Sequence, residues 1–360
     1  MQRADVLEAV ARRETVFERD LSGIDLSGID LSGGRFEKVN FSGADFSGAQ
    51  LNRTGFAKCD FTGARFRNCS LEQCNWMDMR MPGADFTGTR FFMVLFGKSD
   101  VSGADFSGAS FRMCALQEMN MQGAVFHKAR LEQNAMEKSR CEMADFSDAT
   151  MIRLAFSESD MRTLRLEGAT LAKVLFRGCN FSGYNFAGLR MEIVQFDKAL
   201  LDGCDFSGCT LPMCNFSGAS MRMARLAGTK AESALFIGAD LQEAVLEGGS
   251  FSQSVFSESN LTGAICAGGN FELCLFQKAR LVTADFRGAN LKNADFSYAD
   301  LSAGDFSDTN LYMAQFHRAV EKDARYGASK QTLLQSPDPD RVKAEAFVPR
   351  SKPRDKTAQQ

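Results

Sequence analysis

The chain has 360 residues, 44% of them hydrophobic, and a formal net charge of −3. No apolar run approaches the length of a membrane-spanning helix, so no membrane span is expected. The charge is −1 over residues 1–20, −6 over residues 21–316 and +4 over residues 317–360. This weak balance argues against a surface that binds nucleic acid through many phosphate contacts.

Residues 1–20 are expected to form a helical cap. Within this segment, residues 5–18 place Val6, Leu7, Val10 and Ala11 on one stripe between charged residues. The charged N-terminus lacks the apolar stretch of a signal peptide. A cytoplasmic location is therefore expected.

From Leu21 to Phe316 every fifth position carries an apolar side chain, sixty positions in all without a change of register. A period of five fits neither a helix nor a strand, so it indicates a repeat architecture. The units include Ala44 to Gly48 (ADFSG) and Ala289 to Asn293 (ANLKN).

These units resemble those of the pentapeptide repeat family, A(D/N)LxX. The resemblance implies an all-β fold over residues 21–316, a right-handed quadrilateral β-helix with four pentapeptides per coil. About fifteen coils are expected, with short helical caps at the ends.

The distribution of Phe supports a four-sided coil independently. Central positions ending in 6 are Phe in twenty-two of thirty cases, and those ending in 1 in only seven of thirty. A twenty-residue coil would put Phe on two opposite walls and Leu or Met on the other two, which fills the interior. The positions two before each centre are mostly small, as in Ala44 and Ala104.

Two stretches depart from this pattern. Asn134 and Ser139 occupy inward positions near Met136 and Cys141, and Ala231 is a small central residue. Residues 131–142 and 226–235 are therefore hypothesised to bend or open more readily. Tyr184 is a wide residue in a narrow inward position, where it needs a hydroxyl partner or an outward rotation.

After Phe316 the apolar period ends. Residues 317–335 are expected to form a C-terminal cap. Residues 336–360 contain several Pro, Lys and Arg residues and are expected to form a flexible basic tail.

The opening repeats, DLSGIDLSGIDLSG at residues 20–33, are similar to pentapeptide domains encoded beside bacterial type VI secretion genes. This resemblance implies an accessory role in effector loading or export.

Catalysis has little support in the sequence. The two histidines, His127 and His317, lie far apart, and the spacing of Cys204, Cys209 and Cys214 equals the repeat. All eleven cysteines lie inside the repeat and are expected to be core residues in a reducing compartment. No enzyme activity, cofactor, metal or small-molecule substrate is predicted.

One wall of the predicted coil is apolar outside as well as inside. On the wall with centres 36, 56, 76 and 96, the residue before the centre is apolar in eight of fifteen coils. Exposed apolar patches of this size mark partner surfaces, so a protein partner or a homodimer contact is predicted here. The alternative is an irregular coil that tucks these residues inside. The predicted partner-binding residues are Phe92, Met93, Leu95, Met113, Leu175, Ile193, Met213, Leu235, Val255, Leu273 and Leu275.

Two other functions compete with a scaffold that holds a secretion component or effector. Some members of the resembled family mimic B-DNA and bind topoisomerase. A column of Asp at 45, 85, 105, 145, 205, 285 and 305 is compatible with that, although Arg65, Arg165 and Arg225 interrupt it. Bacterial secreted effectors also contain such repeats.

Overall fold

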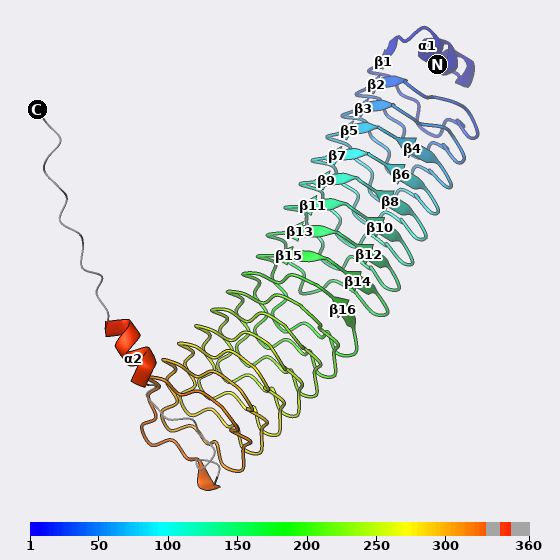
Figure 1. Cartoon of the computed structure of the whole chain (residues 1–360). Helices are drawn as coiled ribbons and strands as arrows, with labels where there is room; N and C mark the ends of the chain where they lie inside the picture. The colour runs from blue at the N-terminus through cyan, green and yellow to red at the C-terminus, as the bar shows by residue number, and fades with distance from the viewer. Residues whose placement is uncertain (329–338, 347–360) are drawn as a thin grey trace, which may run out of the picture.

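The computed structural model describes residues 1–328 and 339–346. In it the chain winds into a long rod built from stacked four-sided coils (Figure 1). Each coil pairs in parallel with the next at a register of twenty residues, from Thr15 opposite Arg35 to Asp305 opposite Arg325. This span corresponds to about fifteen coils. The prediction of a four-sided parallel β-helix is confirmed.

Four walls follow one another along the chain, and we name them by their central residues. Wall A has centres 36, 56, 76 and onward, wall B 41, 61 and 81, wall C 46, 66 and 86, and wall D 51, 71 and 91. The central side chains are buried almost without exception. On wall C, Phe46, Phe66 and Phe86 stack with ring centroids 4.7–4.8 Å apart. That separation is also the spacing of neighbouring β-strands.

Walls A and D contain short strands in the first part of the rod. The nine-stranded sheet of wall A contains β1 (Thr15–Phe17), β2 (Arg35–Glu37), β3 (Gly55–Ala57), β5 (Asn75–Met77), β7 (Leu95–Gly97), β9 (Ala115–Gln117), β11 (Ala135–Glu137), β13 (Ala155–Ser157) and β15 (Leu175–Arg177). The seven-stranded sheet of wall D contains β4 (Ser70–Glu72), β6 (Arg90–Phe92), β8 (Ser110–Arg112), β10 (Arg130–Glu132), β12 (Thr150–Ile152), β14 (Thr170–Ala172) and β16 (Arg190–Glu192). From residue 193 to residue 325 the same register continues as isolated single-residue bridges.

The corners between walls share one backbone conformation. From Arg13 to Asp323, the positions ending in 3 or 8 have a positive φ, with Thr163 as the one exception. Many of these residues are Gly, but Lys, Glu and Met occur there too. At Thr163 the Met143 backbone N–H donates to the Thr163 hydroxyl oxygen at 2.9 Å, and the bridge expected between Arg140 and Asp160 is absent from these described residues.

The ends of the rod differ in detail from the expectations. The first helix, α1 (Arg3–Ala11), is shorter than the predicted segment 5–18, because β1 already begins at Thr15. Val6 of α1 is fully buried, and the Arg3 guanidinium donates to the Ser27 carbonyl at 2.9 Å.

At the other end, coil pairing continues beyond Phe316 into the segment expected to be a cap. Arg325 pairs with Asp305, and the Tyr326 ring stacks on Phe306 with centroids 5.4 Å apart. A second helix, α2 (Pro339–Ala346), lies within the segment expected to be a flexible tail. It lies beside the last coils (Figure 1). Apart from α2, the expected tail lies outside the described residues, and so do residues 329–335 of the expected cap.

Candidate partner-binding surface

The predicted partner-binding residues occupy one side of the rod. Leu95, Leu175, Leu235, Val255 and Leu275 stand immediately before a central residue of wall A, on its outer surface. The others lie at the end of wall D or at the corner between walls D and A. Parallel pairing aligns Leu95 with Ala115 and, further along, Leu235 with Val255 and Val255 with Leu275. We call the whole set the wall A stripe.

The side chains of the stripe point outward, so they do not tuck into an irregular core. Met93, Met113, Leu175, Met213, Leu273 and Leu275 are exposed, with Met213 58% accessible. Phe92, Leu95, Ile193, Leu235 and Val255 are half-buried against their neighbours. Whether a partner covers them stays a prediction.

Two polar residues divide the stripe. In the column of residues that precede the wall A centres, Gln195 and Asn215 lie between Leu175 and Leu235. The Asn215 side-chain amide donates to the Gln195 side-chain oxygen at 3.0 Å. One apolar segment therefore spans the column from Leu95 to Leu175, and the other spans Leu235 to Leu275. The corner between walls A and B is charged, with the Lys278 and Glu258 side chains 3.7 Å apart.

Local contacts give the stripe a firm and uneven surface. The Arg112 guanidinium lies over the Phe92 ring, 4.5 Å from its centroid. The end of the Met77 side chain covers Gly97, where a Cβ atom would lie 2.5 Å from the Met77 methyl. Further along, a shallow cavity of about 310 Å³ is lined by residues that include Ile193, Pro212 and Met213.

Some exposed apolar residues were missed by the sequence reasoning. Ile237 is 41% accessible and lies just after the Phe236 centre on the same wall as Leu235. The prediction counted only the positions before each centre and the corner, so it passed over the position after the centre. Outside wall A, Leu200 and Ile265 are exposed on walls B and C, each flanked in its column by at most one apolar neighbour.

Comparison with known families agrees with this architecture. A model described as "Pentapeptide repeat region" matches residues 29–106, and one described as "Pentapeptide repeats (8 copies)" matches six overlapping or successive segments between residues 99 and 320. This chain is a pentapeptide repeat protein.

Solved structures of other pentapeptide repeat proteins resemble it only loosely. A trypsin-treated form of QnrB1, described as a plasmid-mediated fluoroquinolone resistance protein, is 26% identical over 44% of this chain and 88% of its own, with a TM-score of 0.29. HetL from Nostoc sp. strain PCC 7120, involved in heterocyst differentiation regulation, is 20% identical over 90% of this chain and 94% of its own, with a TM-score of 0.16. No curated protein matches the chain. Superpositions with such low TM-scores carry no inference about function.

The Asp column of wall C in this pentapeptide repeat protein is used by the fold itself. The Asp105 carboxylate accepts a hydrogen bond from the Ser107 backbone N–H at 2.8 Å, and Asp45, Asp145, Asp205 and Asp305 accept equivalent bonds. In Asp305, hydrogen bonds from Ser307 lower the pKa of the carboxyl. These carboxylates hold the turn that follows them.

Arginines also neutralise much of that column. Arg65 lies 2.9 Å from Asp45, Arg165 lies 3.2 Å from Asp145, and Arg287 lies 2.7 Å from Asp285. Arg67 is paired with Asp85 as well. The column therefore does not form a continuous row of unpaired negative charges.

The cysteines and histidines have structural surroundings. All eleven cysteines are buried and free of disulfides, and burial raises the pKa of the Cys59 thiol to about 11. Cys204 and Cys209 donate to backbone carbonyls at 3.0 and 2.9 Å. His317 is 3% accessible, and its Nε2 lies 3.2 Å from the Glu345 carboxylate of α2.

The described residues contain neither a metal-binding cluster nor a membrane-spanning helix. Residues 1–328 and 339–346 contain no cluster of three His, Cys, Asp or Glu side chains able to hold a metal ion. No helix in that same part of the chain is long and apolar enough to cross a bilayer.

Proposed function

We propose that this pentapeptide repeat protein is a non-enzymatic scaffold that binds a protein partner along the wall A stripe. The observation that carries the proposal is the alignment of outward apolar side chains, coil after coil, on one wall of a rod whose other walls are mainly polar. Aromatic and Met side chains such as Phe92 and Met93 are enriched in interface cores, and charged rims surround such cores. The charged corner between walls A and B has that placement.

Helix α2 supports the proposal from within the chain. It lies against the C-terminal end of wall A and the adjoining corner, where the Arg341 guanidinium donates to the Ser297 hydroxyl at 3.0 Å. The Glu345 carboxylate lies 3.1 Å from the Arg318 guanidinium and accepts a hydrogen bond from Tyr298. This side of the rod can therefore hold a helix.

The identity of the partner is proposed on narrower grounds. The opening repeats at residues 20–33 favour a secretion component or an effector as the partner, in the cytoplasm of a bacterium. A homodimer through the same stripe is the alternative occupant. DNA mimicry is less favoured, because Arg pairing and turn formation occupy the Asp column.

The test is affinity capture of the tagged protein from its host, with a triple variant Leu95→Asp, Leu175→Asp and Leu275→Asp alongside. We expect the wild type to recover a partner that the variant loses, because three charges would be buried without compensation in the interface. The matched control carries Met143→Asp, Leu200→Asp and Ile265→Asp, which are exposed on other sides of the rod.

Circular dichroism should show both variants folded. Equal recovery of the partner by all three proteins would contradict the stripe as its binding site. Recovery of a topoisomerase by all three would instead favour wall C and mimicry.

A further inference from the structure

The ladder of backbone hydrogen bonds along wall C is open at one place. Elsewhere, the N–H of a central residue donates to the carbonyl nineteen residues later, as Phe146 does to Arg165 and Phe186 to Asp205, both at 2.7–2.8 Å. Among the described residues, Leu166 makes no such bond to Asn185. The bond from the Asn185 N–H to the Leu164 carbonyl is also missing, and so is the bridge between Arg165 and Asn185.

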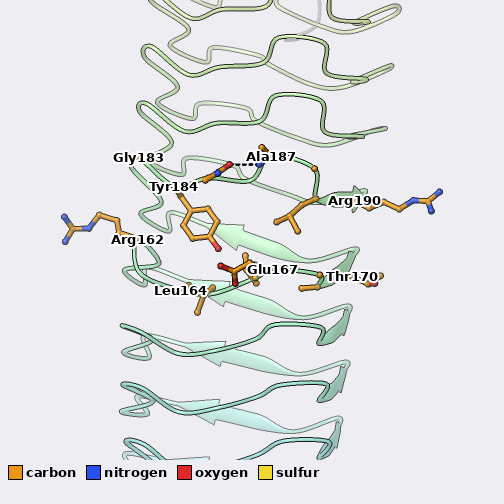
Figure 2. Close-up of a pocket in the computed structure, with 14 residues that line it drawn as sticks. Arg162, Leu164, Glu167, Thr170, Gly183, Tyr184, Ala187 and Arg190 are labelled. Atoms are coloured by element: carbon orange, nitrogen blue, oxygen red, sulfur yellow. Dashed lines mark hydrogen bonds between the residues drawn. The ribbon is translucent and has the colours of Figure 1, made fainter.

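Two wide side chains explain the opening. Tyr184 and Leu189 stand at inward positions, where Tyr184 lies between Leu164 and Cys204 in its column and Leu189 between Ala169 and Cys209. Both are only partly buried against the core. The Tyr184 ring packs on Phe186 with centroids 4.6 Å apart. It lies between the two coils, with its hydroxyl directed toward the coil that contains Glu167 (Figure 2).

The surroundings of the Tyr184 hydroxyl show how it keeps the coils apart. Burial raises the pKa of this hydroxyl, the charge of Glu167 adds to the rise, and the Leu166 backbone N–H offsets it in part. The phenol oxygen thus lies beside an N–H that would otherwise bond to the next coil. The ring acts as a spacer in the wall.

Beside this spacer is a cavity of about 640 Å³. This volume lies within the range of sites that bind small ligands. Its lining comes mostly from facing stretches of two coils, residues 164–170 and 183–190, with Arg162 at the edge (Figure 2). On these stretches the ladder bonds from the Gly168 N–H to the Ala187 carbonyl and from the Arg190 N–H to the Ala169 carbonyl are also missing.

Charged side chains lie at the rim of this cavity. Arg162 is paired with Asp160 at 2.6 Å, and Glu167 lies 3.7 Å from Arg165. Arg190 has no ion-pair partner within residues 1–328 and 339–346. Its side chain extends away from the rod at one end of the opening (Figure 2).

We propose that this opening binds an extended peptide segment of a partner protein, with an acidic side chain of the peptide directed to Arg190. An extended peptide presents N–H and C=O groups in alternation, which matches coil edges that carry both unpaired donors and unpaired acceptors. A simple anion would leave the carbonyl groups without donors. The site is on wall C and at its corner with wall D, so it does not depend on the wall A stripe.

The experiment selects heptapeptides from a random display library on the wild-type protein and measures their binding by fluorescence anisotropy. The double variant Tyr184→Ala and Leu189→Ala replaces both wide side chains with the residue found at Ala144 and Ala169 in the same columns, and should let the ladder close. We expect selected peptides to contain Asp or Glu and to bind this variant at least about tenfold more weakly. Arg190→Gln should weaken them by about fivefold. Tyr312→Ala, at an exposed position, is the matched control and should not change binding.

Hydrogen exchange on the wild type gives a readout that does not depend on the variants. Bound peptide should slow exchange of the Gly168 and Asn185 amides. No enriched peptide, equal affinity for the double variant, or unchanged exchange at these amides would overturn the proposal. Loss of peptide binding in the wall A triple variant would also contradict it, because the two surfaces lie on different walls. Failure of the stripe proposal alone would leave peptide binding intact.

Discussion

Residues 15–192 and residues 193–325 have the same twenty-residue register but different corners. In the first region, walls A and D contain three-residue strands that run into the corner. In the second region, each wall pairs through a single residue between tight turns. The apolar centres are similar in both regions, so the difference must come from other positions.

The inward residue that follows each corner distinguishes two types of corner. One type is a tight turn, and the other, which we call a strand corner, directly follows a three-residue strand. Every alanine at this position, such as Ala84 or Ala239, follows a tight turn, and no strand corner is followed by alanine. After a tight turn the N–H of this residue bonds to the carbonyl three residues earlier, as Ala239 does to Phe236 at 3.1 Å. The turn brings the side chain close to the core, where small residues predominate, although Ile29 and Leu164 also follow tight turns. Val94 and Met119 follow strand corners instead.

Strand corners leave a backbone N–H without its turn partner, and polar inward residues compensate for the loss. The Cys114 N–H donates to the Asn134 side-chain oxygen at 2.8 Å, and the Met119 N–H donates to the Ser139 hydroxyl at 3.2 Å. Buried polar groups need such partners. Asn134 and Ser139, which the sequence suggested were weak points of the core, therefore satisfy corners of the previous coil.

The largest expected effect comes from widening an inward residue behind a tight turn. Ala239→Val should destabilise the second region by about 2–3 kcal/mol, because a close-packed turn cannot accept two extra methyl groups without strain. Cys179→Val changes the same column behind a strand corner and should cost less than about 1 kcal/mol, since Val39 already occupies that column. Urea denaturation followed by circular dichroism measures both. Equal losses would contradict the role assigned to the turn.

A smaller difference should separate two Ser→Ala substitutions. Ser139→Ala leaves the buried Met119 N–H without an acceptor and should cost about 2 kcal/mol. Ser254→Ala should cost about 1 kcal/mol, because the Ala234 N–H keeps its turn bond to the Ala231 carbonyl at 3.3 Å. Amide exchange at Met119 and Ala234 reports the two sites separately. A slower or unchanged Met119 amide would count against the compensation.

A local change is expected at Thr163, the corner residue that avoids positive φ. Thr163→Gly should let this corner adopt the common conformation, because Gly reaches positive φ without steric cost. The bond from the Cys141 N–H to the Asp160 carbonyl, absent in this described stretch, should then form and slow the exchange of the Cys141 amide by about tenfold. Thr283→Gly is the control: Thr283 already has a positive φ, so the Gly263 amide next to it should keep its rate.

The smallest expected effect for each carboxyl group comes from lowering the pH. Hydrogen bonds from Ser27 to Asp25 and from Ser32 to Asp30 lower the pKa of these carboxyls below their ordinary value. Because the folded-state pKa is lower, the stabilisation is present above about pH 4 and is lost as the pH falls through the folded-state values. More of the lowered Asp groups lie in the first region, as Asp20 and Asp85 do.

Trp76, the single tryptophan, lies in that first region and reports its unfolding. Between pH 5 and pH 2.5, the thermal midpoint from Trp76 fluorescence should fall more than the midpoint from far-ultraviolet circular dichroism. Parallel falls of the two midpoints would show that the two regions lose the same stabilisation.

The sequence predicted the coil because its signal is repeated at every centre. The apolar period and the distribution of Phe required four walls, and the stripe followed from sorting outer residues by wall. Three features could not be predicted in this way. The coil continues to Arg325 through Glu321, a central residue that breaks the apolar pattern, and α2 depends on contacts such as Glu345 with His317. The opening at Leu166 depends on how Tyr184 resolves its crowding.

Other information was present in the sequence but was not used. The alanine pattern at inward positions distinguishes the two corner types and would have placed the boundary near residue 193. The Asp residues before the centres were assigned to the surface, whereas the Ser two residues later indicates a turn that the carboxylate holds. Of the two segments hypothesised to open, residues 131–142 border the wall B gap at Thr163, while the ladder is continuous over residues 226–235.

The constant register also fixes the distances between residues along the rod. Leu95 and Val255 lie eight coils apart, which at the spacing of neighbouring strands is about 38 Å. A partner that contacts both Leu95 and Val255 must span that length, and the span can change only in steps of one coil. Removing the twenty residues 196–215 would shorten the distance by about 4.8 Å while leaving each segment intact, so a rigid two-site partner would be lost and a flexible one kept.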